Sequence, residues 1–292
     1  MECYKIINDW IILSKLPLDF KLPHGFSKIR FTDNFNKSID NLPPNLTHLT
    51  LGRNFNKSID NLPPTLKQLN LGYIFNQPIN SLPDCLTHLT LGFMFNQPID
   101  SLPRTITNLI LGYKFNQPID SLPSSLTHLT INFMFDYPID SLPSSITHLS
   151  LGNNFNQPID NLPSSIIQLS IGDRFNQPIN NLPLFITHLT FGYSFDQSID
   201  LLPPTITHLK LGFNFNQDIT KLPNSITHLT LGWRFNQVIK TLPSSITYLE
   251  FGNDFNQPLY QLPLTLTELI LPKKYSQSIS KKFKKQHTIR YE

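Results

Sequence analysis

The chain has 292 residues and a formal net charge of +3, enough length for one or two ordinary domains. Residues 273–292 hold seven lysines and arginines against one acid, a net +6, so the rest of the chain carries −3. A body of this charge lacks the basic surface that a nucleic-acid binder needs.

The first residues, MECYKIINDWIILSK, do not resemble a targeting segment. They contain no basic n-region and no small-residue cleavage site, and Asp9 interrupts their apolar run, which is also too short to cross a bilayer. The two cysteines, Cys3 and Cys85, belong to no spacing pattern, as is usual in a reducing compartment. The sequence therefore predicts a cytoplasmic protein with no membrane partner.

Residues 1–30 precede the regular part of the chain, and we expect them to cap it. Ile7, Trp10 and Ile11 have helical spacing, but Ser14 breaks the next step, so periodicity leaves helix and strand open. We favour a short amphipathic cap over the first coil, followed by a degenerate half-coil.

From residue 31 to residue 272 the chain repeats a unit of 20 residues about twelve times, without insertion or deletion. A phenylalanine marks the unit, and Tyr275 takes the slot after the last one. The marker residues are Phe35, Phe55, Phe75, Phe95, Phe115, Phe135, Phe155, Phe175, Phe195, Phe215, Phe235 and Phe255. Such a short, fixed period predicts a solenoid, because each unit is too small to bury its apolar face alone.

Residues 75–94 show how one coil is expected to fold. Polar and apolar residues alternate over residues 88–91, which predicts a short strand with one buried face. Gly92 then favours a sharp turn. Pro78 and Pro83 argue against a helix on the other side of the coil, because proline lacks the N–H that a helix needs. We expect an extended or polyproline-II-like return leg and little helix.

Side chains inside the coil follow the leucine-rich-repeat pattern. Leu86-x-x-Leu89-x-Leu91 matches the leading half of that repeat, in which leucines point inward and strands stack in parallel. The phenylalanines are expected to stack inside as a column of rings. Asn76 and its copies are assigned to an internal ladder that satisfies backbone groups of neighbouring coils. The predicted fold is a mainly β, leucine-rich-repeat-like solenoid with a parallel β-sheet on one side.

Residues 273–292 are expected to form a basic capping coil. Ile289 and Tyr291 take the inward positions of a strand, while lysines replace the Leu-Pro pair. The KKFKK run at 281–285 could instead be a nuclear-import or anionic-surface signal, but a charged cap is the favoured interpretation.

The phrase Phe-Asn-Gln-Pro-Ile, followed by Leu-Pro-x-x-Ile-Thr-His-Leu, resembles the FNIP repeats of amoebae and of the large DNA viruses that infect them. The resemblance covers about residues 31–280. It implies a leucine-rich-repeat-like fold, and for a viral protein it implies the cytoplasm of the host. Some similar proteins join these repeats to an F-box or a kinase, neither of which is recognisable in this sequence.

The slot after the strand glycine varies most from coil to coil, and it is aromatic in two runs. These residues are Tyr73, Phe93, Tyr113 and Phe133, followed by Tyr193, Phe213 and Trp233. Directly after the strand, the slot should lie along one rim of the sheet. Exposed aromatic rings there would form a candidate partner-binding stripe, because such rings supply much of an interface's energy. Alternatively, the rings fold back over the phenylalanine column and seal the turn.

A second set of residues flanks the strand leucines and should face outward on the sheet. It consists of His48, His88, His128, His148, His188, His208 and His228. Neighbouring histidines about 5 Å apart suggest a metal site. However, Gln68, Asn108, Gln168 and Tyr248 interrupt the set, and no cysteine joins it. We expect packing and hydrogen-bonding residues and no bound metal.

The sequence offers no sign of catalysis or of a cofactor. Its serines, histidines and aspartates all belong to the repeating framework, and it has no Gly-rich phosphate loop, HExxH or CxxC motif. We therefore expect a non-enzymatic scaffold that presents an elongated surface to a protein partner. Two alternatives stay open: a target-recognition subunit of a ubiquitin-ligase-type complex, and a structural element that self-associates through its solenoid ends.

Overall fold

The computed structural model describes residues 4–280, 283–284 and 287–292, and it contains two compact units. Unit 1 comprises Met1–Tyr137 and Ser141–Ile146, and unit 2 comprises Pro138–Asp140 and Thr147–Glu292. Each is a stack of 20-residue coils, which confirms the predicted solenoid class. No helix of the described residues is long and apolar enough to span a membrane.

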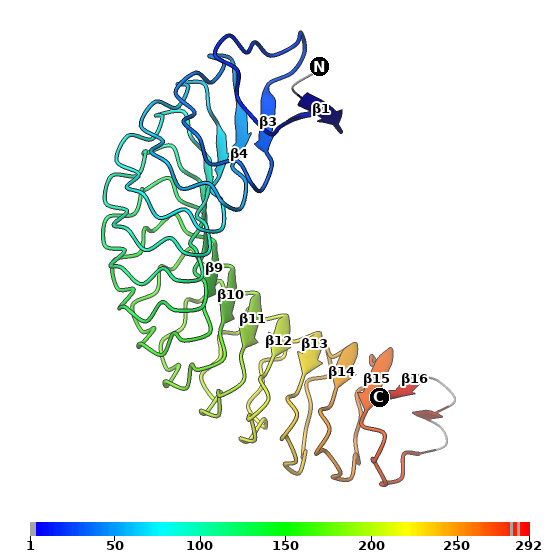
Figure 1. Cartoon of the computed structure of the whole chain (residues 1–292). Helices are drawn as coiled ribbons and strands as arrows, with labels where there is room; N and C mark the ends of the chain where they lie inside the picture. Colours follow the sequence, from blue (N-terminus) through cyan, green and yellow to red (C-terminus); the bar gives the residue numbers. More distant parts are fainter. Residues whose placement is uncertain (1–3, 281–282, 285–286) are drawn as a thin grey trace. The chain divides into compact units, whose positions relative to one another are not determined.

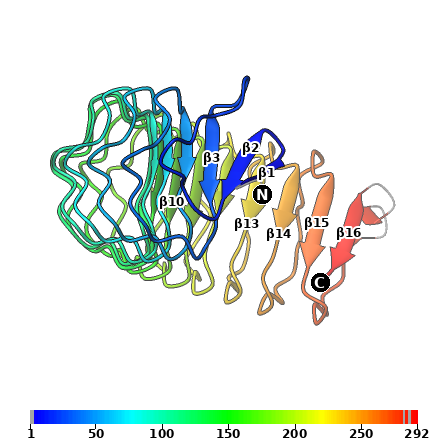
Figure 2. The same ribbon diagram turned by 45° about the horizontal axis from the view of Figure 1, so that its top comes forward.

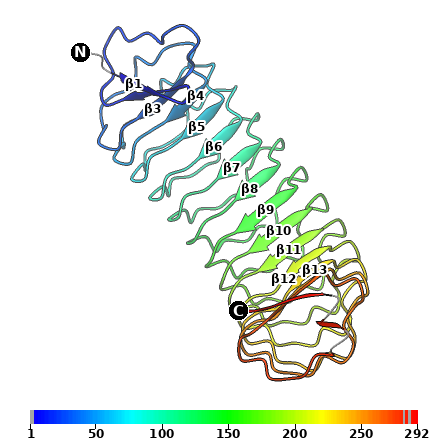
Figure 3. The same cartoon turned by 90° about the vertical axis from the view of Figure 1, so that its right-hand side faces the viewer.

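Unit 1 contains a β-hairpin followed by a ladder of parallel strands. Its strands are β1 (Tyr4–Ile7), β2 (Trp10–Leu13), β3 (Lys28–Phe31), β4 (His48–Thr50), β5 (Gln68–Asn70), β6 (His88–Thr90), β7 (Asn108–Ile110) and β8 (His128–Thr130). From β2 onward, neighbouring strands are parallel, and from β3 onward equivalent residues of successive coils are aligned, such as Leu89 with Leu109. Figure 3 shows β4 to β8 side by side along one side of their coils.

Unit 2 continues the same construction. Its strands are β9 (His148–Leu151), β10 (Gln168–Ile171), β11 (His188–Phe191), β12 (His208–Lys210), β13 (His228–Thr230), β14 (Tyr248–Glu250), β15 (Glu268–Leu271) and β16 (Thr288–Tyr291). All its strand pairs are parallel and in register. Figure 1 shows β9 to β15 next to one another at one edge of the coils, and Figure 2 shows β13 to β16 in the same order.

The segment that precedes the repeats adopts the strand alternative. β1 and β2 pair antiparallel, with Ile7 opposite Trp10. Asn8 and Asp9 join them with φ of 47° and 64°, the left-handed values that a two-residue hairpin turn requires and that Asn and Asp tolerate. The apolar residues have helical spacing but form strands, because β2 also pairs with β3 and extends the sheet.

The return legs contain no α-helix over residues 4–280, as the prolines predict. In the reference coil, the N–H of Leu86 donates to the carbonyl oxygen of Pro83 at 3.0 Å. The same tight turn recurs at each Leu-Pro pair, for example between Ile226 and Pro223. It returns the chain to the sheet and buries Leu86 completely.

The buried phenylalanines form the predicted column of stacked rings. Every ring from Phe55 to Phe255 is completely buried. Ring centroids lie 6.1–6.4 Å apart between Phe35 and Phe135 in unit 1. In unit 2 the spacing between Phe155 and Phe255 is 6.0–6.2 Å. These rings supply the largest apolar contribution of each coil.

The glycine after the strand is required for a different reason than the turn that the sequence suggested. Among the described glycines, only Gly25 has a positive φ. A Cβ added at Gly92 would lie 1.8 Å from the carbonyl oxygen of Gly72 in the preceding coil. Glycine is therefore needed in most coils because successive coils approach one another closely, and Thr32 and Asn132 are the exceptions within the repeats of unit 1.

The asparagine ladder forms, but it lies at the surface. The backbone N–H of Asn96 donates to Oδ1 of Asn76 at 2.8 Å, and the same bond links Asn216 to Asp196. A carboxylate oxygen serves as well as an amide oxygen, which explains Asp at this position. The prediction of an internal ladder is wrong in its burial, because these side chains are exposed or half-buried. Their bonds satisfy backbone groups between coils that lie at the edge of the core.

The last strand keeps the register of the repeats without their burial. Tyr291 aligns with Leu271, as its inward position requires, yet it is 44% exposed. Within the described residues no further coil stacks on β16, so its ring stays partly exposed. Most of the KKFKK run lies outside the described residues.

The buried column makes a prediction about stability. Phe215→Ala should lower the free energy of unfolding by about 3–5 kcal/mol, because it leaves a cavity in a closed apolar interior. Phe213→Ala, two residues earlier and only half-buried, is the matched control and should cost less. Urea denaturation followed by circular dichroism measures both. Equal costs for the two variants would contradict the assigned interior.

Candidate functional site

The aromatic residues after the strands form stacked rings in both units. In unit 1, Tyr73, Phe93, Tyr113 and Phe133 have centroids 4.3–4.6 Å apart and nearly parallel planes. The guanidinium of Arg53 lies 4.6 Å from the Tyr73 centroid. We call these four aromatic residues the unit 1 rim. Its first ring, Tyr73, makes a cation–π contact with Arg53.

The unit 2 rim consists of Tyr193, Phe213 and Trp233. Centroids are 4.4 Å apart for the first pair and 5.5 Å for the second. The guanidinium of Arg234 lies 5.7 Å from the Phe213 centroid. Tyr193 and Trp233 are 48% and 47% exposed. The rings thus stack on one another at the surface and leave their edges open to solvent.

The difference between ring spacings shows how the coils of each unit diverge. Equivalent rings of adjacent coils are 4.3–4.6 Å apart in the unit 1 rim but 6.1–6.4 Å apart in the buried column. Unit 2 shows the same direction, 4.4 and 5.5 Å in the rim against 6.0–6.2 Å in the column. Within each unit the coils are closest together on the sheet side, so the sheet lies on the concave face.

The histidines lie on the outer surface of the sheet, exposed or half-buried, as the alternation predicted. In unit 2, His188, His208 and His228 form what we call the histidine row. Their ring centroids are 4.2 Å apart at both steps, and Tyr248 continues the stack at 5.8 Å. In unit 1, Gln68 and Asn108 separate the histidines of β4, β6 and β8.

Hydrogen bonds to threonine fix the orientation of each ring in the row. Nδ1 of His208 lies 2.9 Å from Oγ1 of Thr207, and this hydroxyl also lies 3.2 Å from the carbonyl oxygen of Thr187. A hydroxyl has one proton and a carbonyl only accepts, so both contacts are satisfied when Nδ1–H donates to Oγ1. Nε2 then keeps a lone pair in the neutral ring. His188 and His228 repeat this arrangement.

The surroundings of His208 and of His48 favour the neutral ring. Burial, followed by the charges of His188 and His228, lowers the pKa of His208 below its ordinary value of 6.5. Burial and then Lys28 lower the pKa of His48, while Asp9 opposes them. Among the described residues, no group of three His, Cys, Asp or Glu side chains could hold a metal ion.

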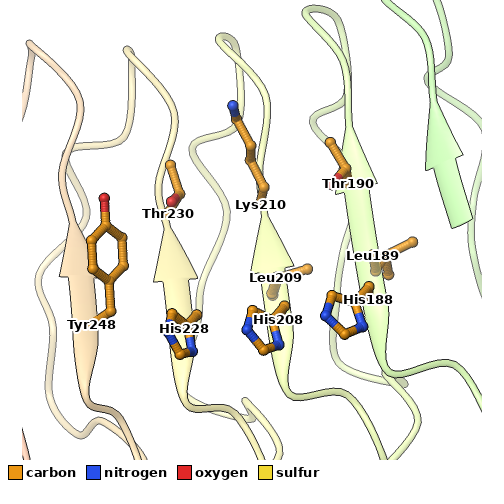
Figure 4. A pocket seen from close by; sticks show the side chains of 9 residues that line it. All are labelled: His188, Leu189, Thr190, His208, Leu209, Lys210, His228, Thr230 and Tyr248. Carbon is orange, nitrogen blue, oxygen red and sulfur yellow. The ribbon is translucent and has the colours of Figure 1, made fainter. Parts of the chain in front are cut away.

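Figure 4 shows how the residues around the histidine row are arranged. The three imidazoles and Tyr248 lie near the start of their strands, and Thr190, Lys210 and Thr230 form a second row further along. These residues line a hollow of about 230 Å³. A second hollow, of about 610 Å³, is lined by the unit 2 rim together with Lys210 and Glu250.

Three residues of this site were not singled out by the sequence as candidates. Tyr248 had been taken as an interruption of the histidines, yet its ring continues their stack. Its hydroxyl donates to Oε2 of Glu250 at 2.8 Å, and burial followed by Glu250 raises the pKa of Tyr248. Lys210 is exposed, and its Nζ makes no ion pair within the described residues. Lys210, Tyr248 and Glu250 all depart from the repeat consensus, and this departure was the sequence signal that could have identified them as candidates.

The lowered pKa of His208 predicts that acid destabilises the fold. The unfolded chain binds the proton more readily, so stability is complete above pH 6.5 and is lost as the pH falls below this value towards the folded pKa. We expect the melting temperature to fall between about pH 7.5 and about pH 5. His208→Gln should reduce this fall, since glutamine already occupies the same slot at Gln68 and Gln168.

His88→Gln is the control for this experiment. His88 lies between Gln68 and Asn108, so replacing it should leave the pH dependence close to that of the natural chain. The same pH dependence of the melting temperature in the natural chain and in His208→Gln would contradict the assigned effect of burial and of His188 and His228 on the pKa of His208.

Known proteins share this construction. The FNIP Repeat family model matches residues 35–74, 55–94, 95–134, 135–174, 155–194, 175–214, 195–232, 215–241 and 235–274. No curated protein matches the chain. CroV588, whose crystal structure is described as a novel circular LRR protein, is 43% identical with a TM-score of 0.76. The similarity covers 89% of this chain and 45% of CroV588, so the chain spans less than half of that protein's length.

Two more distant structures share the fold. YopM from Yersinia enterocolitica is 21% identical with a TM-score of 0.62, over 96% of this chain and 66% of its own. An internalin (inlF) from Listeria monocytogenes is 18% identical with a TM-score of 0.59, over 90% and 77%. The match of the family model from residue 35 to residue 274 and the stacked 20-residue coils lead to one conclusion: the chain belongs to the FNIP repeat family.

Proposed function

We propose that the chain is a non-enzymatic scaffold that binds a protein partner on the concave sheet face of unit 2, over β11 to β13. The observation that supports this proposal is that three features occur together on these three coils. They hold an uninterrupted histidine row, an uninterrupted aromatic rim and the two hollows. Solenoids generally use such extended concave surfaces for binding.

The unit 2 rim has the chemistry of an interface centre. Tyrosine, tryptophan and arginine are the residues that contribute most to binding energy, and here Tyr193, Trp233 and Arg234 all lie against the ring of Phe213. Stacking already restricts these rings, so a partner would lose little side-chain entropy by ordering them. Threonine, lysine and glutamate side chains lie beside the rings and would supply a polar rim.

Unit 1 provides a comparison within the same chain. Its four rim rings are as well stacked as those of unit 2, but no continuous histidine row accompanies them. If the combined surface matters, substitutions in unit 2 should affect the partner more than equivalent substitutions in unit 1.

A capture experiment tests this function. The tagged full-length chain, Trp233→Ala and Phe93→Ala would each be used to capture proteins from the native cell, followed by mass spectrometry. Trp233→Ala should lower the recovery of the specific partner by about 30-fold or more, the loss typical of a central aromatic residue. Phe93→Ala should retain it. Equal losses in both variants, or no loss in Trp233→Ala while it remains folded by circular dichroism, would reject the site.

Self-association is a second candidate function, and the N-terminal hairpin favours it. Within the described residues, β1 pairs only with β2, and Ile6 and Ile7 on it are 51% and 56% exposed. An apolar edge strand of this kind is a template for pairing with another chain. CroV588 is described as circular, and this chain spans less than half of its length, so pairing of two copies is one way to build a comparable ring.

Light scattering coupled to size-exclusion chromatography tests the second candidate. The natural chain should show a mass that rises above the 33.6 kDa monomer with concentration, because a free edge pairs by mass action. Ile6→Lys combined with Ile7→Lys should restore the monomer, since charge on an edge strand opposes pairing. A monomer at every concentration would remove this candidate and leave the concave-face proposal unaffected.

A further inference from the structure

The histidine row indicates the chemistry of the segment that the concave face would take. We infer that His188, His208 and His228, with Lys210 beside them, bind an acidic segment of the protein partner and take up protons as they do so. The inference rests on the proposed function, because it specifies which groups the partner brings to the same face.

The charged residues that the structure describes around the row are one cation without an ion pair, one hydrogen-bonded acid and one ion-paired acid. Lys210 Nζ makes none of the ion pairs found in the described part of unit 2. Glu250 on β14 accepts hydrogen bonds from the Tyr248 hydroxyl at 2.8 Å and from Thr230 Oγ1 at 3.2 Å. Glu268 on β15 is paired with Arg290 at 3.0 Å. On the other side, β10 presents the uncharged Gln168 and Ser170. An incoming carboxylate therefore meets the charge of Lys210, unpaired within the described residues and two strands away from Glu250, which is hydrogen-bonded but still negatively charged.

The bonds to threonine explain why binding would require protons. Because Nδ1–H of each ring is directed to a threonine hydroxyl, the free nitrogen Nε2 is an acceptor in the neutral ring. A carboxylate is also only an acceptor, so the two cannot bond. Protonation converts each Nε2 into a charged donor, and charged donors make the stronger hydrogen bonds to carboxylates.

Stacking makes proton uptake and anion binding depend on each other. Three imidazolium rings with centroids 4.2 Å apart would repel one another without a counter-ion. An acidic segment removes this repulsion, and by linkage the protons strengthen binding as much as the segment favours the protons. In the free chain, burial and the neighbouring histidines already keep the pKa of His208 low.

The dimensions suit an extended acidic peptide. The row covers two steps of 4.2 Å. Alternate side chains of an extended segment are about 6.8 Å apart, so two acids at positions i and i+2 would lie over the three rings. A nucleic acid is less suited, because Lys210 is the only permanently charged cation among the described residues that line the hollow and could neutralise few phosphates.

The test uses a fluorescent hexaglutamate peptide as the probe and the full-length chain. Affinity measured at about pH 5.5 should exceed that at about pH 7.5 by at least about tenfold. Calorimetry in buffers of different ionisation enthalpy should show net proton uptake on binding. His208→Gln, which interrupts the row as glutamine does elsewhere, should remove most of the pH dependence and of the proton uptake.

The controls separate the row from other sources of binding. His88→Gln should behave as the natural chain does, and a hexaglutamine peptide should not bind. The basic residues 273–292 are present in every variant, so binding to them cannot distinguish His208→Gln from His88→Gln. Binding without proton uptake, the same pH dependence in both variants, or equal pH dependence for a single-stranded oligonucleotide would each overturn the inference.

The outcome can be read separately from that of the capture experiment. If Trp233→Ala loses the native partner while hexaglutamate binding is independent of His208, the inference fails and the proposed function stands. If Trp233→Ala retains the partner, the proposed function fails whatever the peptide does.

Discussion

The close stacking of each coil on the next is the interaction on which the rest of the structure depends. A coil of 20 residues has no interior of its own, and its phenylalanine is buried only between the rings of its two neighbours. At Gly92 the neighbouring backbone is so near that it leaves no room for a Cβ. The surface ladder of Asn76 and its copies ties the same coils together. One inserted residue would disturb all three contacts at once.

Constant register turns each repeated side chain into a row, and curvature decides how close its members lie. Rings on the sheet side are 4.2–4.6 Å apart in most steps, against 6.0–6.4 Å in the interior. Equivalent side chains of successive coils therefore lie close together on the concave face. For aromatic rings this is favourable stacking, whereas for imidazoles it is a source of repulsion once they are protonated. The same geometry thus gives the face both a stacked apolar rim and a row of closely spaced titratable rings.

The framework positions of the repeat serve the fold, and the variable positions distinguish one coil from another. Gln68, Asn108 and Gln168 break the histidines in places where the fold does not need them, while β11, β12 and β13 keep three in succession. Lys210, Tyr248 and Glu250 depart from the consensus next to that run. The proposed partner surface is thus a local property of a few coils. The exposed edge of β1 is chemically separate, which is why the two candidate functions can be tested independently.

The sequence by itself determined the solenoid, its period, the buried phenylalanine column and the parallel sheet, because a fixed 20-residue repeat without insertions permits one stacking. It also placed the histidines outward and the aromatic residues beside the strand ends. Only the tertiary structure decided the features that depend on distances between coils. These are the surface position of the Asn76 ladder, the reason for Gly92, the stacking of Tyr248 on His228 and the hairpin at Trp10. A periodic sequence fixes which residues align, but the spacing of neighbouring coils fixes what those residues can do.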